Sequence, residues 1–287
     1  MNLSGLGARL AGLLRGGGRR ALAAMPWRAA AFALLLLGLY LGMDRTVRAR
    51  DGARIGAHGV RLAALAPELR EEGIRSDLES ALRPFRGRSI HERGILGEIA
   101  ERAAGLPWIH EVRRVSYRFE GEGVAIAFDL QARLPAARVV QGGRERLVDR
   151  VGVVLPPAIY AEGLDLPSIH GVRGGAPAPG VAWGDERLRV ALRVLEAYRA
   201  RGFASRRTGL GVAVVRVGSL SPETAGPQIV VVTREGKELR FSHGEGPGRL
   251  PLDEQLDRLE EALADPRVWV RVQQYVDLRF ADHIPAR

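Results

Sequence analysis

The sequence feature that most constrains the fold is an uncharged apolar run of fifteen residues, 29–43, AAAFALLLLGLYLGM. A helix of this length covers about 22 Å, less than the roughly 30 Å hydrocarbon core of a bilayer. Arg28 and Arg45 are long enough to reach the headgroups, and Trp27 and Tyr40 suit the membrane interfaces. The run therefore predicts one transmembrane helix.

A cleavable signal peptide is the alternative interpretation, because apolar runs of 7–15 residues are typical of such signals. Val47-Arg48-Ala49 would supply small residues for cleavage. The long segment before the run and the charges of Asp44, Arg45 and Arg48 favour an uncleaved anchor instead.

The charge of the N-terminal tail predicts the orientation of this helix. The formal net charge is +10, and residues 1–28 contribute five arginines and no acidic residue. The positive-inside rule then places residues 1–28 in the cytoplasm and the chain after residue 43 on the opposite side of the membrane. In a bacterial cell this means an inner-membrane anchor with the chain after residue 43 in the periplasm. Beyond the tail, no basic run is interleaved with aromatic residues, which argues against nucleic acid as a partner.

After a polar connector, residues 44–54, the pattern predicts a first folded region over 55–134. A strand is expected at 55–60, and Ser76 and Glu79 match a capping box for a helix that ends at Arg83. A second helix carries Ile95, Ile99 and Ala103 on one face. Alternating apolar residues then predict two strands around a turn at 120–123, which gives a β-α-α-β-β unit.

Residues 135–287 predict a mixed β-sheet domain with two or more helices, so the fold class is α+β. Amphipathic helices are expected over 185–201 and 252–263. The expected strands are short and lie at 139–140, 144–149, 151–155, 212–217, 229–233, 238–241, 268–272 and 275–280.

No arrangement of residues indicates catalysis. The chain has no cysteine, which excludes disulfides, zinc–thiolate sites and a cysteine nucleophile. The six histidines are scattered without ligand spacing, and His243 begins a Gly-rich turn that lacks an adjacent nucleophile. Asp149 and Asp277 could form a carboxylate pair, although each is better placed to bond its own turn. We therefore expect no enzyme activity, cofactor, metal or small-molecule substrate.

Five motifs resemble the FtsQ/DivIB family of bacterial cell-division proteins, in the order that the family has them. They are Leu106-Pro107-Trp108-Ile109 followed by Val112 and Arg114, Gln131-Ala132-Arg133-Leu134-Pro135-Ala136-Ala137, Leu147-Val148-Asp149-Arg150-Val151-Gly152-Val153-Val154, Pro167-Ser168-Ile169-His170-Gly171 and Tyr275-Val276-Asp277-Leu278-Arg279-Phe280. One departure is Gln-Ala-Arg at 131–133, where the family tends to have Glu-Arg.

The resemblance implies an anchored protein with a POTRA domain (55–134) and a β-domain (135–287) at the division septum. It also implies a scaffold function without catalysis, in which small bitopic partners of the FtsB/FtsL type bind, together with FtsK-like proteins.

We expect the partner at the exposed edge of the C-terminal sheet, because an edge strand offers unpaired backbone groups to an added strand. Pro285 lacks the backbone N–H that a strand donates, so the edge for the partner is either short or displaced to 275–280. Arg279 either pairs with an acidic residue of the partner or pairs with Asp277 in its own sheet. The expected contact residues are Tyr275, Arg279, Phe280, Asp282, His283 and Ile284.

Two other functions remain open from the sequence. One is a POTRA-containing module for envelope assembly or secretion, which would normally be followed by a barrel of alternating strands. The other is an anchored periplasmic enzyme that acts on the cell wall, which would need a convergent acid–base or metal set.

Overall fold

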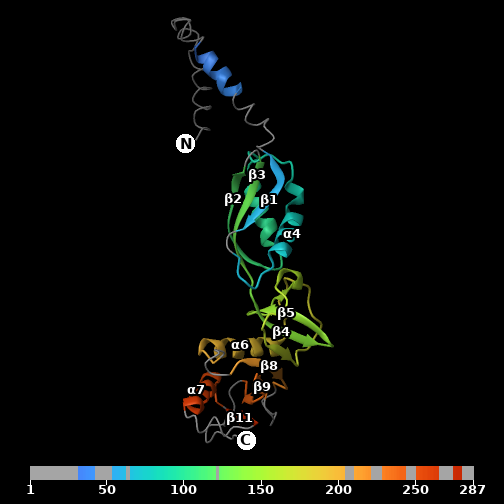
Figure 1. Ribbon diagram of the computed structural model, residues 1–287, viewed down its shortest axis with the longest axis vertical. Coiled ribbons are helices and arrows are strands. Elements are labelled where there is room, and N and C mark those ends of the chain that lie inside the picture. The colour runs from blue at the N-terminus through green and yellow to red at the C-terminus, as the bar shows by residue number, and fades with distance from the viewer. Residues whose placement is uncertain are drawn as a thin grey trace, which may run out of the picture. The chain divides into compact units, whose positions relative to one another are not determined.

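The computed structural model (Figure 1) describes residues 32–42, 54–62, 65–120, 123–203, 210–220, 228–243, 250–264 and 274–279. The chain divides into two compact units. One comprises Gly59–Phe85, Gly94–Arg118 and Ile126–Arg287, and the other comprises Met1–His58, Arg86–Arg93 and Phe119–Ala125.

Residues 32–42 form a helix within the predicted transmembrane run. All of its residues are exposed, and its large apolar side chains, such as Phe32 at 63% and Leu34 at 69%, have no protein cover. Among the helices with a described placement, none has both the length and the apolar character required to cross a membrane. The predicted positions 29–31 and 43 lie outside the described residues.

The first folded region has the predicted β-α-α-β-β order. Its three strands form one sheet in the order β1-β3-β2. The elements are β1 (Ile55–Leu62), α4 (Glu71–Leu82), the 3₁₀ turn η2 (Arg83–Phe85), α5 (Ile95–Ala104), β2 (Ile109–Glu120) and β3 (Gly123–Ala132). The predicted apolar face of α5 is confirmed, because Ile95, Ile99 and Ala103 are all buried.

The capping box predicted at Ser76 is wrong, because Ser76 lies in the middle of α4. The helix begins at Glu71, where two acidic residues occupy the first turn and favour the positive end of the helix dipole. Asp77, inside the predicted box, instead accepts a hydrogen bond of 2.7 Å from Nε1 of the buried Trp108.

In the described residues of the second region, eight strands form a mixed sheet in the order β11-β10-β9-β8-β7-β4-β5-β6. The pairs β4–β7, β7–β8 and β10–β11 are parallel, and the remaining neighbours are antiparallel. The strands are β4 (Pro135–Gln141), β5 (Arg144–Asp149), β6 (Val154–Leu155), β7 (Ser168–His170), β8 (Val212–Val217), β9 (Ile229–Thr233), β10 (Glu238–Phe241) and β11 (Tyr275–Asp277).

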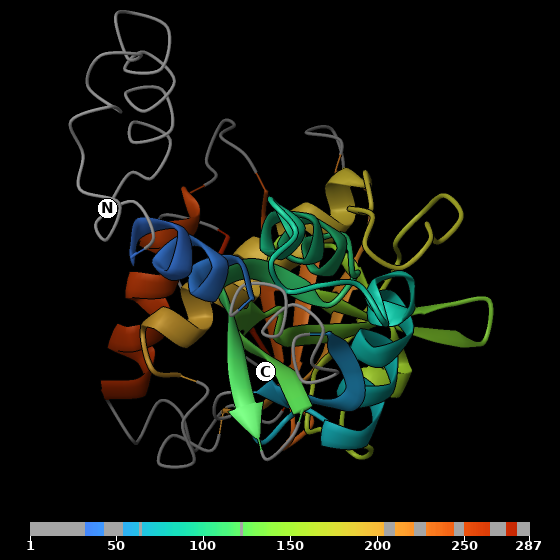
Figure 2. The ribbon, with the colours of Figure 1, turned by 90° about the horizontal axis from the view of Figure 1, so that it is seen from above.

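The helices α6 (Glu186–Ala200) and α7 (Leu252–Ala264) pack beside this sheet. The helix α6 contacts β8 and α7, and Figures 1 and 2 show both helices next to the strands. Asp185 caps α6 by accepting the N–H of Arg187 at 2.6 Å. The predicted apolar face of α6 is confirmed, since the core contains Leu188, Ala191, Leu192, Leu195 and Tyr198.

A backbone pairing joins the residues before α4 to the 3₁₀ turn η3 (Pro157–Ile159) and the residue that follows it. The N–H of Arg70 donates to the carbonyl of Ile159 at 2.8 Å, and Leu69 forms an isolated bridge with Tyr160. Gly73 lies so close to this turn that an added Cβ would be 2.4 Å from the carbonyl oxygen of Ala158. The start of α4 therefore depends on a partner about 90 residues away in sequence.

Candidate functional site

The predicted edge strand β11 lies at one end of the eight-strand sheet as the structure describes it. It runs parallel to β10, with Tyr275 opposite Glu238, Val276 opposite Leu239 and Asp277 opposite Arg240. Two further backbone bonds extend this register: Glu238 N–H donates to Gln274 O at 2.8 Å, and Leu278 N–H donates to Arg240 O at 3.0 Å.

The alternation of a strand then fixes where the remaining backbone groups point. Gln274 and Leu278 bond to β10. Val276 lies two residues from each of them, so its backbone groups point to the same side of the strand. Successive residues of a strand direct their N–H and C=O groups to opposite sides. The backbone groups of Tyr275, Asp277 and Arg279 therefore point away from β10, toward the edge.

The outward groups at Arg279 are already bonded within the chain. Its N–H donates to Asp277 Oδ1 at 3.3 Å, and its carbonyl accepts the N–H of Leu250 at 3.2 Å. The vacant positions for an added strand therefore reduce to Tyr275 and Asp277, for which β10 is the strand partner among the described residues.

The side chain of Arg279 forms a bidentate ion pair with Asp277. Nε donates to Oδ1 at 2.8 Å and a terminal nitrogen donates to Oδ2 at 2.7 Å. Both side chains are buried, with 11% of Arg279 and 6% of Asp277 exposed. Of the two pairings that the sequence left open for Arg279, the structure contains the one within its own sheet.

Tyr275 is the other predicted contact residue with a described placement. It is half-buried, and the guanidinium carbon of Arg240 lies 3.8 Å from the centre of its ring, a cation–π contact. The predicted contact residues Phe280, Asp282, His283 and Ile284 lie outside the described residues, as does the expected strand 268–272.

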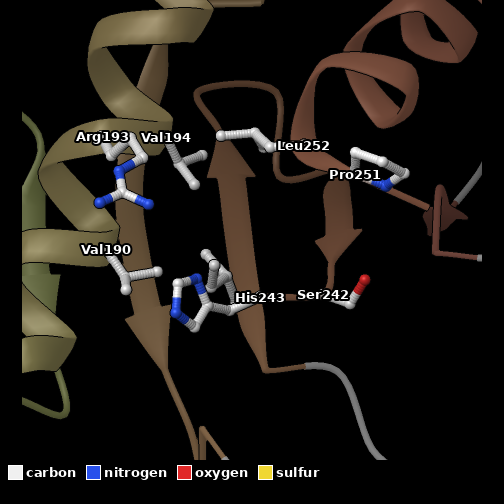
Figure 3. Close-up of a pocket in the computed structure, with 8 residues that line it drawn as sticks. Val190, Arg193, Val194, Ser242, His243, Pro251 and Leu252 are labelled. Atoms are coloured by element: carbon white, nitrogen blue, oxygen red, sulfur yellow. The ribbon is translucent and has the colours of Figure 1, made fainter. Parts of the chain in front are cut away.

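A cavity of about 200 Å³ lies between α6, the ends of β9 and β10, and the start of α7 (Figure 3). Figure 3 shows the imidazole of His243 in this cavity, with Arg193 and Val190 on the facing helix. Burial lowers the pKa of His243 below its ordinary value of 6.5, the charge of Arg193 lowers this pKa further, and Glu186 opposes both. The imidazole is therefore neutral at pH 7.

Two buried glutamines hold the end of β10 beside this cavity. Gln228 accepts the N–H of His243 at 2.6 Å, and Gln255 accepts the N–H of Ser242 at 2.9 Å. Gln255 also donates to the carbonyl of Leu250 at 2.6 Å. Sequence reasoning missed both residues, and the one available signal was the position of Gln255 beside the apolar stripe of α7.

The other residues considered for chemistry are accounted for by structural bonds. Asp149 accepts the N–H groups of Val151 and Val153, which is the turn-bonding role predicted for it. Asp277 on β11 and Asp149 on β5 are not a carboxylate pair, because the strands between them in the sheet are β10, β9, β8, β7 and β4. Within the ranges that the structure describes, no three acidic or histidine side chains are grouped as metal ligands.

Comparison with known proteins gives one relative to report. No protein-family model matches the chain. Over 140 residues the chain is 34% identical to the cell division protein FtsQ of Anaeromyxobacter sp. (strain K). This similarity supports an FtsQ-like family. The match covers 49% of this chain and 42% of the relative, so the chain spans about two fifths of the length of the curated relative it matches.

Proposed function

We propose that this protein is a non-enzymatic cell-division scaffold that binds small bitopic partners of the FtsB/FtsL type through the edge at β11. The similarity to FtsQ supports the process, and the position of β11 at the end of the sheet supports the mode of binding. The observation that carries the proposal is that the backbone groups of Tyr275 and Asp277 point away from β10.

Recognition in this proposal is by strand addition. Each backbone hydrogen bond contributes about 0.5–1.5 kcal/mol net, so a short edge holds a partner only together with side-chain contacts. The residues predicted for those contacts are Phe280, Asp282, His283 and Ile284, together with Tyr275. Arg279 acts as a positioning residue, because its pair with Asp277 fixes the strand end that faces the partner.

The proposal includes a single inner-membrane anchor over 29–43, with a cytoplasmic tail, a connector over 44–54 and a periplasmic POTRA domain and β-domain. The exposed apolar side chains of the helical residues 32–42 support the anchor, because soluble proteins rarely leave such a surface in water. In this arrangement the protein links cytoplasmic and periplasmic division proteins at the septum, including FtsK-like partners.

The edge is tested with proline, which removes an N–H donor and is tolerated at strand edges where that donor faces solvent. Tyr275→Pro removes an outward donor of β11 and leaves the backbone hydrogen bonds of Gln274 and Leu278 to β10 intact, although the cation–π contact between Tyr275 and Arg240 is lost. We expect co-purification of the full-length protein with its small bitopic partners to fall at least about tenfold.

Glu145→Pro is the matched control. Gln141 and Arg144 close a two-residue turn, so the next pair, Val140 and Glu145, is the non-hydrogen-bonded one, and the N–H of Glu145 points away from β4. This change should leave partner recovery unaltered. Equal recovery of partners with Tyr275→Pro and with the wild type would refute binding through the edge at β11. A fluorescent fusion that spreads evenly around the cell, instead of gathering at midcell, would refute the division function.

A further inference from the structure

A second cavity, of about 310 Å³, has a strongly basic lining. It lies where β3 leads into β4, beside the turn after β5 and the C-terminal end of α6. Three arginines line it, Arg133, Arg150 and Arg199, together with His110. Asp149 is the carboxylate among the lining residues.

The carboxylate of Asp149 is already satisfied by groups of its own region. Oδ2 accepts Arg133 at 2.9 Å, and Oδ1 accepts the N–H groups of Val151 at 3.0 Å and Val153 at 2.8 Å. Only 6% of the Asp149 side chain is exposed. The negative charge of Asp149 and the positive charge of Arg133 therefore offset each other, and the positive charges of Arg150 and Arg199 remain.

These two arginines differ in how firmly they are held. Arg199 donates to the carbonyl of Ala136 at 2.6 Å, and burial lowers its pKa while Glu196 opposes this, but a guanidinium stays charged at neutral pH. Arg150 is exposed and makes no hydrogen bond or ion pair with any residue of the described ranges.

The turn that carries Arg150 is rigid. The N–H of Gly152 donates to the carbonyl of Asp149 at 3.1 Å, and Gly152 has a φ of +84°, which only glycine adopts easily. The bonds to the Asp149 carboxylate hold the same turn from inside. Arg150 and Val151 are thus presented together at its tip, and the cost of ordering them on binding is reduced.

Exposed aliphatic side chains border the same cavity. Val151 is 65% exposed and Leu134 is 48% exposed. The lining therefore combines three arginines against one lining carboxylate with an exposed aliphatic surface.

We propose that this cavity binds an acidic segment of another polypeptide. An Asp or Glu carboxylate of that segment contacts Arg150 and Arg199, and a neighbouring aliphatic side chain packs on Val151 and Leu134. Arginine clusters recognise acidic motifs through charge-assisted, bidentate hydrogen bonds. A cavity of this size is at the small end for ligand sites, which suits one or two side chains of a peptide.

This site is separate from the proposed edge at β11, because β4 and β5 lie at the other end of the sheet order. The proposal does not rest on the proposed function. Tyr275→Pro should leave binding at the basic cavity unchanged, so that failure of one proposal is distinguishable from failure of the other.

The test measures fluorescence polarisation of a labelled Gly-Leu-Glu-Leu-Glu-Leu peptide with the full-length protein in a neutral detergent. The counterpart peptide with Gln in place of Glu should bind at least about tenfold more weakly. Arg150→Gln should weaken binding of the acidic peptide about tenfold, and Val151→Ser about threefold. Both side chains are exposed, so the unfolding midpoint should not change.

Arg144→Gln is the matched control, because Arg144 is an exposed arginine on β5 outside the cavity. It removes the same charge and should change binding by less than about twofold. Equal binding of the Glu and Gln peptides, or equal loss with Arg150→Gln and Arg144→Gln, would overturn the proposal. If Arg150→Gln reduces binding to phosphatidylglycerol vesicles but not to the peptide, the site recognises a membrane and the proposal is likewise overturned.

Discussion

The buried pair of Asp277 and Arg279 gives the sharpest test of how the C-terminal edge is built. Arg279→Met keeps most of the volume of the side chain and removes the charge. The Asp277 carboxylate, of which 6% is exposed, then loses both guanidinium bonds and keeps one weak bond, at 3.3 Å, from the N–H of residue 279. Removing one partner of a buried ion pair typically costs about 3–5 kcal/mol of unfolding free energy.

That cost is a large fraction of the 5–15 kcal/mol by which ordinary domains are stable, so the variant should unfold at a much lower urea concentration. The double variant Asp277→Leu with Arg279→Met should recover most of the loss, because no uncompensated charge remains. Circular dichroism of the full-length protein in urea measures all three free energies.

Arg216→Met is the matched control on the same sheet. Arg216 lies 3.4 Å from Glu238 with 57% of its side chain exposed, and Glu238 keeps Arg240 as a second partner at 3.1 Å. This change should cost no more than about 0.5 kcal/mol.

A loss below about 1 kcal/mol for Arg279→Met would refute the reasoning. It would mean that the pair is solvated and that the Arg279 side chain is available to a partner. The size of the loss also decides how the edge can be tested. Because charge reversal at Arg279 would damage the fold, partner loss in such a variant says nothing about recognition, and Tyr275→Pro is the better test.

Two further predictions concern packing and pH. Gly73→Ala should lower the midpoint of thermal unfolding, with a cost of about 1–3 kcal/mol, because its Cβ would meet the Ala158 carbonyl at 2.4 Å. Gly97→Ala in α5, where nothing lies within 4 Å, should instead stabilise by about 0.5–1 kcal/mol, and equal effects of the two changes would contradict the close approach. The pKa of His243 is lower in the folded protein than its ordinary value of 6.5, so the unfolded chain takes up the proton first as the pH falls. The contribution of His243 to stability is therefore fully present above pH 6.5. It is lost as the pH falls through the lower pKa of the folded state. In His243→Gln the urea midpoint should depend less on pH below 6.5 than in the wild type, and an unchanged pH profile would contradict this.

Several elements could be predicted because their signals are local. The helix α6 combines a capping Asp185 with an apolar face of helical period, and both features act within a few residues of each other. The helix α5 and the alternating strands β2 and β3 follow from the same kind of local pattern. Their predicted positions agree with the structure for that reason.

The prediction failed where a distant segment competes with a local signal. Ser76 and Glu79 match a capping box, yet α4 extends past them to Glu71, because the preceding residue bonds to Ile159 and Ile74 is buried. Gln228 and Gln255 could not be found from the sequence, since their role depends on the backbone groups of His243 and Ser242 that folding brings to them.

The sequence by itself determined the apolar run, the order of the elements in the first folded region and the absence of any cysteine chemistry, because hydropathy and periodicity are properties of neighbouring residues. It did not predict β7, which lies between β8 and β4. Only the tertiary structure decided that Arg279 pairs with Asp277, that the backbone groups of Tyr275 and Asp277 point away from β10, and that Arg150 and Arg199 share one cavity with Asp149. The physical reason is that charge pairing depends on distance and burial, and both are set by which strands and helices meet.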